Sequence, residues 1–348
     1  MTRRARTASI TIRTEADVLA LVPFTLGFVP EDSLVLLTLD QDGAPFQARV
    51  DLPPRPGLLP AAVAALVDPA VRNGGSRGLV VVYSDDPVLA QAAAWALHLS
   101  LRRAGIQTVV AIRADGQRWY PLRLADRGTR RGSLAAVHEV DPDSLDVVGV
   151  PYDLRSHPLT TRSVFEGRVT HGSRQELADS VARSDAEAAA VATAFRDLPA
   201  LRPSLTSELV EEGRALVEEV RALLRSDDPV DAVDPASVAR LLRGIAHRDV
   251  RDLLWCEITR FTADRHVVLW RAVVVRSPDA LVAPAAGLLA FAAWLAGDGA
   301  LAWCAVDRCL DADPGHMLGR LVSQALEEGL PPSAWRPVDP STLPLAAT

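Results

Sequence analysis

The sequence predicts an α/β or α+β fold, in which an N-terminal half built on a mixed β-sheet with helices precedes an all-helical C-terminal half. Apolar runs of strand length alternate with helical patterns as far as Tyr120, and no strand pattern follows residue 150. The chain has 348 residues, which corresponds to about two domains at ~150 residues each. We therefore expect a sheet domain at 1–150 that ends in a long connecting loop, a helical domain at 151–330 and a Pro-rich tail at 331–348.

The N-terminal half starts with a helical pattern at 14–22, capped by Thr14 and ended by Pro23. Two strands follow, joined by a hairpin turn at Gln41-Asp42-Gly43. The remaining elements alternate between helices and strands. In order, we expect strands at 33–39 and 46–52, a helix at 58–71, a strand at 78–83, a helix at 88–104 and strands at 106–112 and 118–120.

The run Gly78–Tyr83 (GLVVVY) is apolar without alternation. Strands that are buried on both faces have this pattern, so Leu79, Val80, Val81 and Val82 should form a central strand. The order strand-strand-helix-strand-helix-strand-strand implies a mixed sheet with at least one right-handed crossover.

The C-terminal half begins with a capping box, Ser173 and Glu176, which predicts one long helix as far as Phe195. The tail from Pro331 is rich in proline and is expected to be loose. Further helices are expected at 206–224, 234–245, 250–258, 266–275, 284–295, 300–310 and 318–328.

A helix pair surrounds Gly297-Asp298-Gly299, with the small residues Ala290 and Ala302 placed for a close contact. This pair is either an ordinary hairpin in a helical bundle or a single tetratricopeptide-like hairpin. Such solenoids need about three repeats of ~34 residues, and we find no clean repeat of that length. The ordinary hairpin is therefore favoured.

The composition is that of a folded globular protein, with 49% hydrophobic and 23% charged residues. A net charge of −7 favours solubility, and the chain has no excess of positive charge that would attract nucleic acid. All 37 basic residues are Arg, so the lysine-free chain excludes Schiff-base, P-loop and general-base lysines.

The expected location is the cytoplasm. Three cysteines are too few for a disulfide framework, and the N-terminal arginines are not followed by the apolar region of a secretory signal. The apolar stretch Leu281–Leu295 is short for a membrane span, so we expect a buried helix there.

Several segments together resemble an actinobacterial family named domain of unknown function 4192. They are ADVLALVPFTLGFVPEDSLVLLTL with ARVDLP, LVVVYSDD, the QRWY run, VPYDLRSHP with GRVTHGSRQELA, and LLAFAAWLAGDGALAWCAVDRCLDADPG. The resemblance implies a cytoplasmic protein and carries over no activity. Relatives often have a Cys-containing insert after the Arg-Trp pair, but residues 121–148 contain no Cys, which puts a metal or redox role of that insert in doubt here.

The first candidate site is the GFVPEDS loop from Gly27 to Ser33. Asp32 and Ser33 could bind a ligand at the entrance of a strand, or the loop could be turn chemistry alone. Arg49 and Asp51 lie two residues apart on a strand and so share one face. They could contact a ligand or pair with neighbours.

Asp85 and Asp86 form the second candidate, because they follow the most buried strand. In open α/β sheets ligands bind beyond the carboxyl ends of the strands, where two carboxylates could hold Mg²⁺. Alternatively, Asp86 is the N-cap of the next helix. Arg118 and Trp119 could stack on a base or a peptide if they are exposed, or anchor the sheet if they are buried.

No metal or cofactor site is predicted. Cys304, Cys309 and His316 could suggest a metal site, but the two cysteines lie on different faces of a helix and are expected to be core residues. His171 precedes a helix start and is expected to pack there. The chain has no GxSxG, no Walker motif and no GxGxxG after a strand.

Two functions remain open. The favoured one is a non-enzymatic ligand-binding or protein-interaction and regulatory protein, with a protein or small-molecule partner and with neither nucleic acid nor membrane. The alternative is a metal- or nucleotide-dependent hydrolase with its site at Asp32, Ser33, Asp85 and Asp86. A single polar cleft that gathers the loop, Asp85 and the Arg118–Tyr120 strand would favour a ligand or enzyme site.

Overall fold

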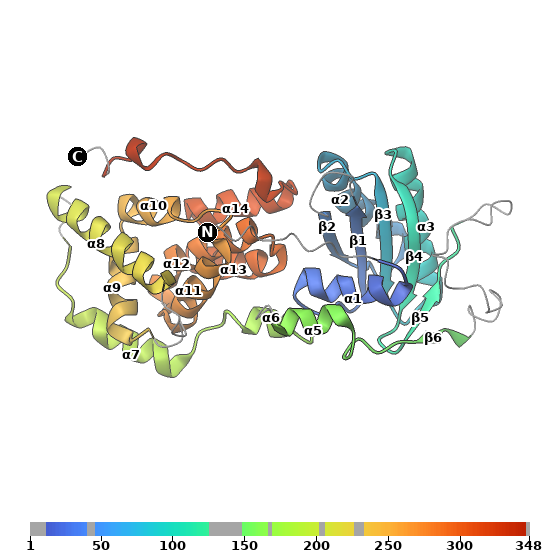
Figure 1. The fold of residues 1–348 in the computed structure, drawn as a ribbon, viewed down its shortest axis with the longest axis horizontal. Helices are drawn as coiled ribbons and strands as arrows, with labels where there is room; N and C mark the ends of the chain where they lie inside the picture. The colour runs from blue at the N-terminus through green and yellow to red at the C-terminus, as the bar shows by residue number, and fades with distance from the viewer. Residues whose placement is uncertain are drawn as a thin grey trace, which may run out of the picture. The chain divides into compact units, whose positions relative to one another are not determined.

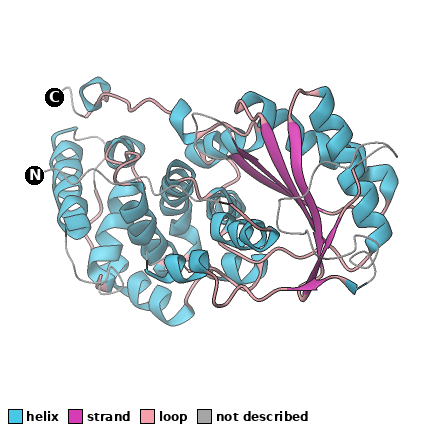
Figure 2. Ribbon diagram, turned by 45° about the vertical axis from the view of Figure 1, so that its right-hand side comes forward, coloured by secondary structure: helices cyan, strands magenta, loops and turns pink. Residues whose placement is uncertain are grey.

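The computed structural model describes residues 12–39, 46–124, 148–165, 169–201, 206–225 and 233–345. The chain divides into two compact units, Met1–Ser173 and Arg174–Thr348. The described strands all belong to the first unit, and the described elements of the second are helical (Figure 2). This confirms the predicted fold class. The expected turn at Gln41-Asp42-Gly43 and most of the expected connecting loop lie outside the described residues.

The first unit is built on a mixed sheet that has six strands among the described residues, in the order β2-β1-β3-β4-β5-β6 (Figure 1). β1 is antiparallel to both of its neighbours, β3 and β4 are parallel, and the last two strands are added antiparallel. The strands are β1 (Ser33–Leu39), β2 (Phe46–Asp51), β3 (Arg77–Tyr83), β4 (Gln107–Ala114), β5 (Arg118–Pro121) and β6 (Val150–Pro151).

β3 is the central strand that the sequence predicts. Leu79, Val80, Val81 and Val82 are buried, and the strand has a hydrogen-bonded neighbour on each side. Gly78 lets β3 pack closely, because a Cβ there would lie 3.3 Å from a methyl carbon of Leu36. Two apolar faces on one strand require cover on both sides of the sheet.

One face of the sheet is covered by α2 (Leu59–Arg72) and α3 (Pro87–Arg103), whose buried residues share a core cluster with β1 and β3. In β2, Phe46, Ala48 and Val50 pack against this cluster. The alternating residues of β2 therefore point to the other face, where Gln47 Nε2 donates to Thr25 O of α1 (Glu15–Leu26) at 2.8 Å. Arg49 and Asp51 accordingly lie on the α1 face.

α1 extends past the proline that was expected to end it. The helix continues through Pro23 to Leu26 and stops at Gly27, whose φ is +76°. A proline in a helix removes one backbone donor. Here the Thr25 hydroxyl donates to Leu21 O at 2.9 Å and supplies a further bond in the last turn. The stop is instead set by the left-handed conformation that glycine adopts without strain.

The described residues at 150–165 and 169–173 group with the sheet unit, and the helical unit begins at Arg174. β6 pairs with β5, and α5 (Pro158–Phe165) packs against α1. These contacts join segments that are far apart in the chain, so the local sequence pattern near residue 150 does not reveal them. The domain bounds expected from the sequence stay a prediction.

The long helix expected from Ser173 to Phe195 is wrong, because the structure has α6 (Arg174–Asp179) and α7 (Asp185–Asp197) in its place. The break between them is held by the helix α11 (Ala263–Arg276). Arg271 Nε donates to Ser180 O at 3.1 Å, and Ser184 N donates to Val275 O at 2.8 Å. Tertiary hydrogen bonds thus replace the helical ones that the local sequence favours.

The other helices of the second unit agree with their expected positions within a few residues. α12 packs against α11, α13 and α14, and almost all of its residues are buried. One stretch, Asp279–Ala296, is long and apolar enough to cross a membrane, but 72% of it is buried inside the structure, as in a core helix. The elements are α8 (Thr206–Arg225), α9 (Pro235–Ile245), α10 (Arg248–Cys256), η3 (Asp279–Leu281), α12 (Val282–Ala296), α13 (Gly299–Ala312) and α14 (Met317–Glu327).

The C-terminal segment contacts the helical unit at Trp335, although most of its side chains are exposed, and the looseness expected of the tail stays a prediction. It contains η4 (Pro332–Ala334) and η5 (Pro340–Thr342). The Trp335 ring lies 5.1 Å from that of Trp255 and 5.0 Å from that of Phe291, between ring centroids. Aromatic rings bury large apolar areas, so a single tryptophan is enough to hold a segment of otherwise unfavourable composition.

The hairpin of α12 and α13 turns at Gly297, whose φ is +84°, and Asp298 caps the second helix by accepting from Leu301 N at 3.0 Å. Ala290, Ala302 and Val306 are fully or almost fully buried. Small side chains at these places allow the two helices to approach closely.

Ala302→Leu should lower the free energy of unfolding by roughly 1–3 kcal/mol, because the added carbons have no space between the two helices. Ala312→Leu, at the exposed end of the same helix, is the matched control and should change stability little. Equilibrium denaturation of both variants measures the difference. Equal curves for Ala302→Leu and the parent would show that the contact is not tight.

His266 is a fully buried polar side chain in α11, and neither of its ring nitrogens has a hydrogen-bond partner within the described part of the chain. Burial lowers the pKa of His266 from 6.5 to about 4. The folded state therefore holds the imidazole neutral where the unfolded state binds a proton. Stability is fully present above pH 6.5 and falls as the pH decreases towards about 4.

His266→Leu should therefore flatten this loss of stability between pH 6.5 and about 4, and should be neutral or stabilising at pH 7 because it removes unpaired buried polar atoms. Urea denaturation across that pH range measures the effect. His98 and His316, whose pKa values burial also lowers, leave a residual slope of the same sign. An unchanged slope in the variant would contradict the assignment, and His247→Leu, at a partly exposed histidine, is the control.

Candidate functional site

The strand register places the candidate residues along one end of the sheet. Ser33 pairs with Asp51 on one side and with Tyr83 on the other. The row continues from Tyr83 to Ala114, then to Trp119 and Val150. We call this row the sheet-end row. It lies at the carboxyl ends of the parallel strands β3 and β4, where ligands bind in open α/β sheets.

On the α1 side of the sheet-end row, Ser33, Arg49 and Asp51 contact one another directly. Arg49 Nε donates to Ser33 Oγ at 2.9 Å, and its guanidinium lies 2.6 Å from Asp51 Oδ1. The guanidinium carbon is also 6.0 Å from the centre of the Phe28 ring. The Arg49 side chain is 14% exposed and that of Asp51 is 73% exposed, so only the carboxylate of this group reaches solvent freely.

The GFVPEDS loop joins this group through its backbone. Gly27 O accepts from His171 N at 2.8 Å, and Val29 N donates to His171 O at 3.0 Å. Asp32 has a φ of +37°, and its carbonyl accepts from Leu52 N at 2.7 Å. Aspartate tolerates this conformation better than most residues. The loop is therefore held on both sides, and Ser33 Oγ donates back to Glu31 O within it.

A second group lies near β4 and β5, around an arginine that sequence reasoning missed. Arg113 is buried, donates to Ser84 O at 3.0 Å, and its guanidinium carbon lies 3.8 Å from the centre of the Tyr120 ring. The Tyr120 hydroxyl donates to Asp115 at 2.9 Å. One signal could have found Arg113, since it is the charged residue of a strand and lies near its end, after the apolar run Val109–Ile112.

Asp115 is stabilised as a carboxylate. Burial alone would raise its pKa, but the backbone donors of Arg118 and Gln117, the Tyr120 hydroxyl and the charge of Arg113 together lower it. Burial raises the pKa of Tyr83 and of Tyr152, and Tyr152 is further raised by Asp115. These tyrosines are therefore neutral hydrogen-bonding groups at neutral pH.

Arg118 and Trp119 have structural contacts. Trp119 is buried, so it anchors the sheet and does not form the exposed stacking surface that was the alternative. Arg118 donates to the carbonyl oxygens of Val148 and Gly149 at 2.8 and 3.0 Å. It thereby holds the start of β6 against β5.

The two aspartates after β3 have different roles. Asp86 is the N-cap of α3, as the structural alternative predicted, because its carboxylate accepts from Val88 N and Leu89 N at 2.8 and 3.1 Å. Asp85 is exposed. Among the described residues, no three His, Cys, Asp or Glu side chains lie close enough together to hold a metal ion.

The structure thus brings Ser33, Arg49 and Asp51 into one contact group, while Gly27 and Asp32 bond through their backbones to His171 and Leu52. Asp85, Arg118 and Trp119 lie on the same end of the sheet without joining that group. The sheet topology places them there, because parallel strands end at one edge and antiparallel neighbours begin there.

The cysteine-histidine pair of the helical unit belongs to its core. Cys309 is buried, its Sγ lies 3.1 Å from Ala283 O and 3.2 Å from His316 Nδ1, and Arg251 lies 3.3 Å from His316 Nε2. Burial raises the pKa of Cys309 to about 12. A thiol in this state is a poor nucleophile, so the pair agrees with the core interpretation from the sequence.

These features define an α+β protein with a mixed-sheet unit and a helical unit. The chain belongs to the family described as domain of unknown function (DUF4192), whose family model matches residues 16–333. The match spans both units, in agreement with the resemblance seen in the sequence. No curated protein and no solved structure matches the chain significantly.

Gly149→Ala should destabilise the protein more than Gly116→Ala. Both glycines have positive φ values, +64° and +87°, but a Cβ at Gly149 would lie 2.5 Å from the Tyr120 ring and one at Gly116 would meet nothing. We expect about 1–2 kcal/mol from the backbone at each position, and a further cost at Gly149 from the clash. Thermal denaturation of the two variants separates the contributions, and equal losses would show that Tyr120 is not held by its bond to Asp115.

Proposed function

We propose that this protein is a non-enzymatic binding protein, of the ligand-binding or regulatory type, that takes a small molecule or a peptide at the sheet-end row. The single observation that carries this proposal is the register, which aligns the exposed Asp51 with Ser33 and Tyr83 in one row at the carboxyl ends of β3 and β4. Preformed polar groups that are held by their own neighbours are suited to recognition, since binding then costs little ordering.

The hydrogen bonds of Ser33 support binding over catalysis. Its hydroxyl donates to Glu31 O and accepts from Arg49, so its proton is directed to a backbone carbonyl. A nucleophilic serine needs a base within hydrogen-bond reach to accept that proton. The alternative, a metal- or nucleotide-dependent hydrolase at Asp32, Ser33, Asp85 and Asp86, also has one fewer available carboxylate, because Asp86 caps α3.

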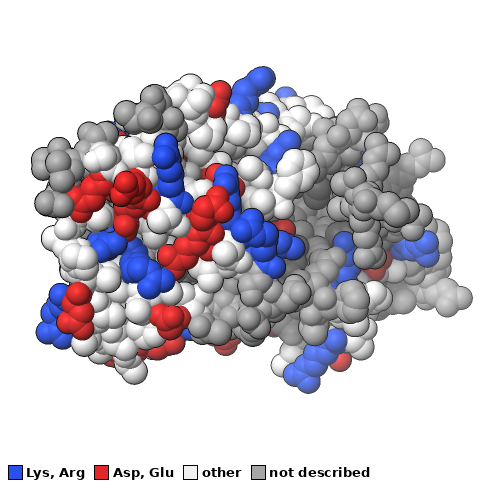
Figure 3. Space-filling model, turned by 60° about the vertical axis from the view of Figure 1, so that its left-hand side comes forward, with Lys and Arg blue, Asp and Glu red and all other residues white. Residues whose placement is uncertain are grey.

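We further propose that the protein acts in the cytoplasm, with a protein or small-molecule partner and with neither a nucleic acid nor a membrane. The free cysteines Cys256, Cys304 and Cys309 support a reducing compartment. Acidic and basic side chains are mixed on the face of the helical unit that Figure 3 shows. Ion pairs of the helical unit, such as Arg243 with Glu212, balance opposite charges. A phosphate backbone binds best to a surface of uniform positive charge.

Asp85→Asn tests the proposal, because Asp85 is exposed beside the sheet-end row and its replacement should leave the fold intact. A thermal-shift screen of metabolites and short peptides on the full chain should find a compound that raises the apparent melting temperature. Its affinity for Asp85→Asn should be about tenfold lower or weaker still, as expected for the loss of one bond to a charged group.

Asp68→Asn is the matched control, an exposed aspartate on α2, and should bind as the parent does. Equal affinities for the parent and Asp85→Asn would contradict this site. Turnover of an ester or phosphoester by the parent, abolished in Ser33→Ala, would favour the hydrolase instead.

A further inference from the structure

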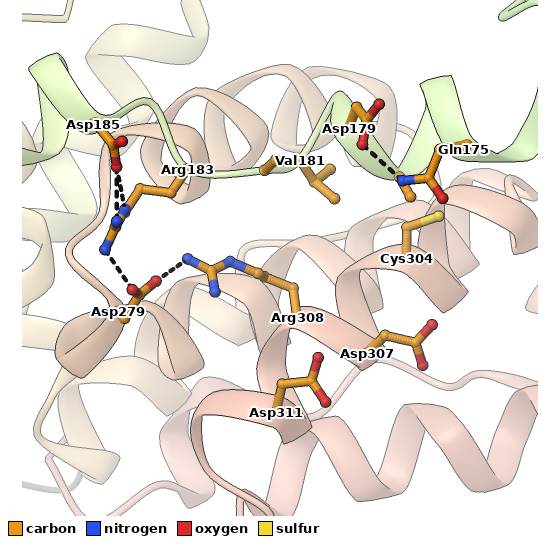
Figure 4. Close-up of a pocket in the computed structure, with 12 residues that line it drawn as sticks. Gln175, Asp179, Val181, Arg183, Asp185, Asp279, Cys304, Asp307, Arg308 and Asp311 are labelled. Atoms are coloured by element: carbon orange, nitrogen blue, oxygen red, sulfur yellow. Dashed lines mark hydrogen bonds and ion pairs between the residues drawn. The ribbon is translucent and has the colours of Figure 1, made fainter.

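The helical unit contains a recess of about 420 Å³ between α6 and α13 (Figure 4). We call it the α6–α13 recess. It exists because the expected long helix breaks after Asp179, so that the chain turns away from α13 before α7 begins. Its volume is within the range of small-molecule sites. Its charged walls are formed by Asp179, Arg183, Asp279, Asp307, Arg308 and Asp311.

One wall is electrically balanced by its own residues. Asp279 of η3 accepts from both Arg183 and Arg308, and Arg183 also contacts Asp185 at 2.7 Å. The bond from Arg308, with the charges of both arginines, lowers the pKa of Asp279. Two guanidinium groups and two carboxylates therefore neutralise one another in a continuous chain of ion pairs (Figure 4).

The face of α13 next to these ion pairs has an excess of negative charge. Asp307 and Asp311 lie four residues apart on α13, so they share one face of the helix. Neither makes an ion pair with another described residue. Partial burial raises the pKa of Asp307, Asp311 acts in the same direction, and Arg174 opposes them. Asp179 adds a third carboxylate, which accepts only the amide of Gln175, at 2.8 Å, among the described side chains.

The floor between these charged groups is apolar. Ala178 and Val181 line it, together with Cys304, which is only 9% exposed. The Cys304 thiol points towards the side chains of Gln175 and Asp179 and makes no hydrogen bond to another described residue (Figure 4). Burial raises the pKa of Cys304 to about 11, so its sulfur is a neutral, weak acceptor that faces the recess.

We propose that the α6–α13 recess binds a small organic cation that has two or more ammonium groups joined by a methylene chain. The carboxylates Asp179, Asp307 and Asp311 would accept from the ammonium groups, and the apolar floor would contact the methylenes. The described carboxylates do not gather closely enough for one metal ion, which favours a cation whose charge is spread over its length. This site is separate from the sheet-end row and does not depend on it.

Calorimetric titration of the full chain at low ionic strength tests the proposal, with 1,4-diaminobutane and spermidine as ligands and butylamine and Mg²⁺ as comparisons. The diamine should bind at least about tenfold more tightly than butylamine, because it makes a second charge-assisted contact. Added salt should weaken the binding, since the contacts are ionic.

The variant Asp307→Asn with Asp311→Asn should lose at least about tenfold in affinity for the diamine. It should still fold, because it removes repulsion between like charges, and its melting curve checks this. The matched control is Asp249→Asn with Asp264→Asn, which removes the same charge from α10 and α11 and should bind as the parent does.

Three results would overturn the proposal. They are equal affinities for butylamine and the diamine, unchanged binding by the folded double variant at Asp307 and Asp311, and tighter binding of Mg²⁺ than of the diamine at these aspartates. An equal loss in the control pair would likewise show that only the net charge of the protein attracts the amines.

Discussion

The pairing of β3 with β1 and β4 is the constraint on which the rest of the sheet unit depends. β3 is apolar on both faces, so its backbone groups must be hydrogen-bonded on both sides and its side chains covered on both faces. The antiparallel partner β1 and the parallel partner β4 satisfy the backbone. The helices α2 and α3 cover one face, and α1 lies on the other. The position of β3 then determines which residues share the end of the sheet.

The polar groups at that end are largely satisfied by one another. Arg49 is shared by Ser33 and Asp51, and Arg113 by Ser84 and the Tyr120 ring. A buried guanidinium that lacked such partners would be costly, so each arginine is accompanied by acceptors from neighbouring strands. This arrangement makes a polar edge whose side chains are held by their own neighbours.

The helical unit distributes its polar groups differently. The His266 side chain has no hydrogen-bond partner within the described residues. Asp307 and Asp311 share one face of α13, and neither makes an ion pair with another residue that the structure describes. The buried imidazole of His266 lowers the stability of the folded state at acidic pH. The two aspartates leave negative charge at the α6–α13 recess. Both features follow from the packing of α11, α12 and α13. Apolar contacts dominate this packing, and the polar side chains occupy the positions that these contacts leave.

The sequence by itself determined the fold class, the central strand and most helix positions, because these depend on local patterns. The unbroken run Gly78–Tyr83, the glycine after α12 and the caps Asp86 and Asp234 are each readable within a few residues. Family membership was also visible in the sequence, since the same segments carry it.

The tertiary structure alone decided the features that depend on contacts between distant residues. These are the break between α6 and α7, the packing of Trp335, the burial of Arg113 and the gathering of Arg49 with Ser33. Each rests on hydrogen bonds or ring contacts between segments far apart in the chain, where tertiary interactions outweigh local propensity. Local propensity is worth only about 1 kcal/mol or less per residue for most residue types, and a few such contacts exceed it.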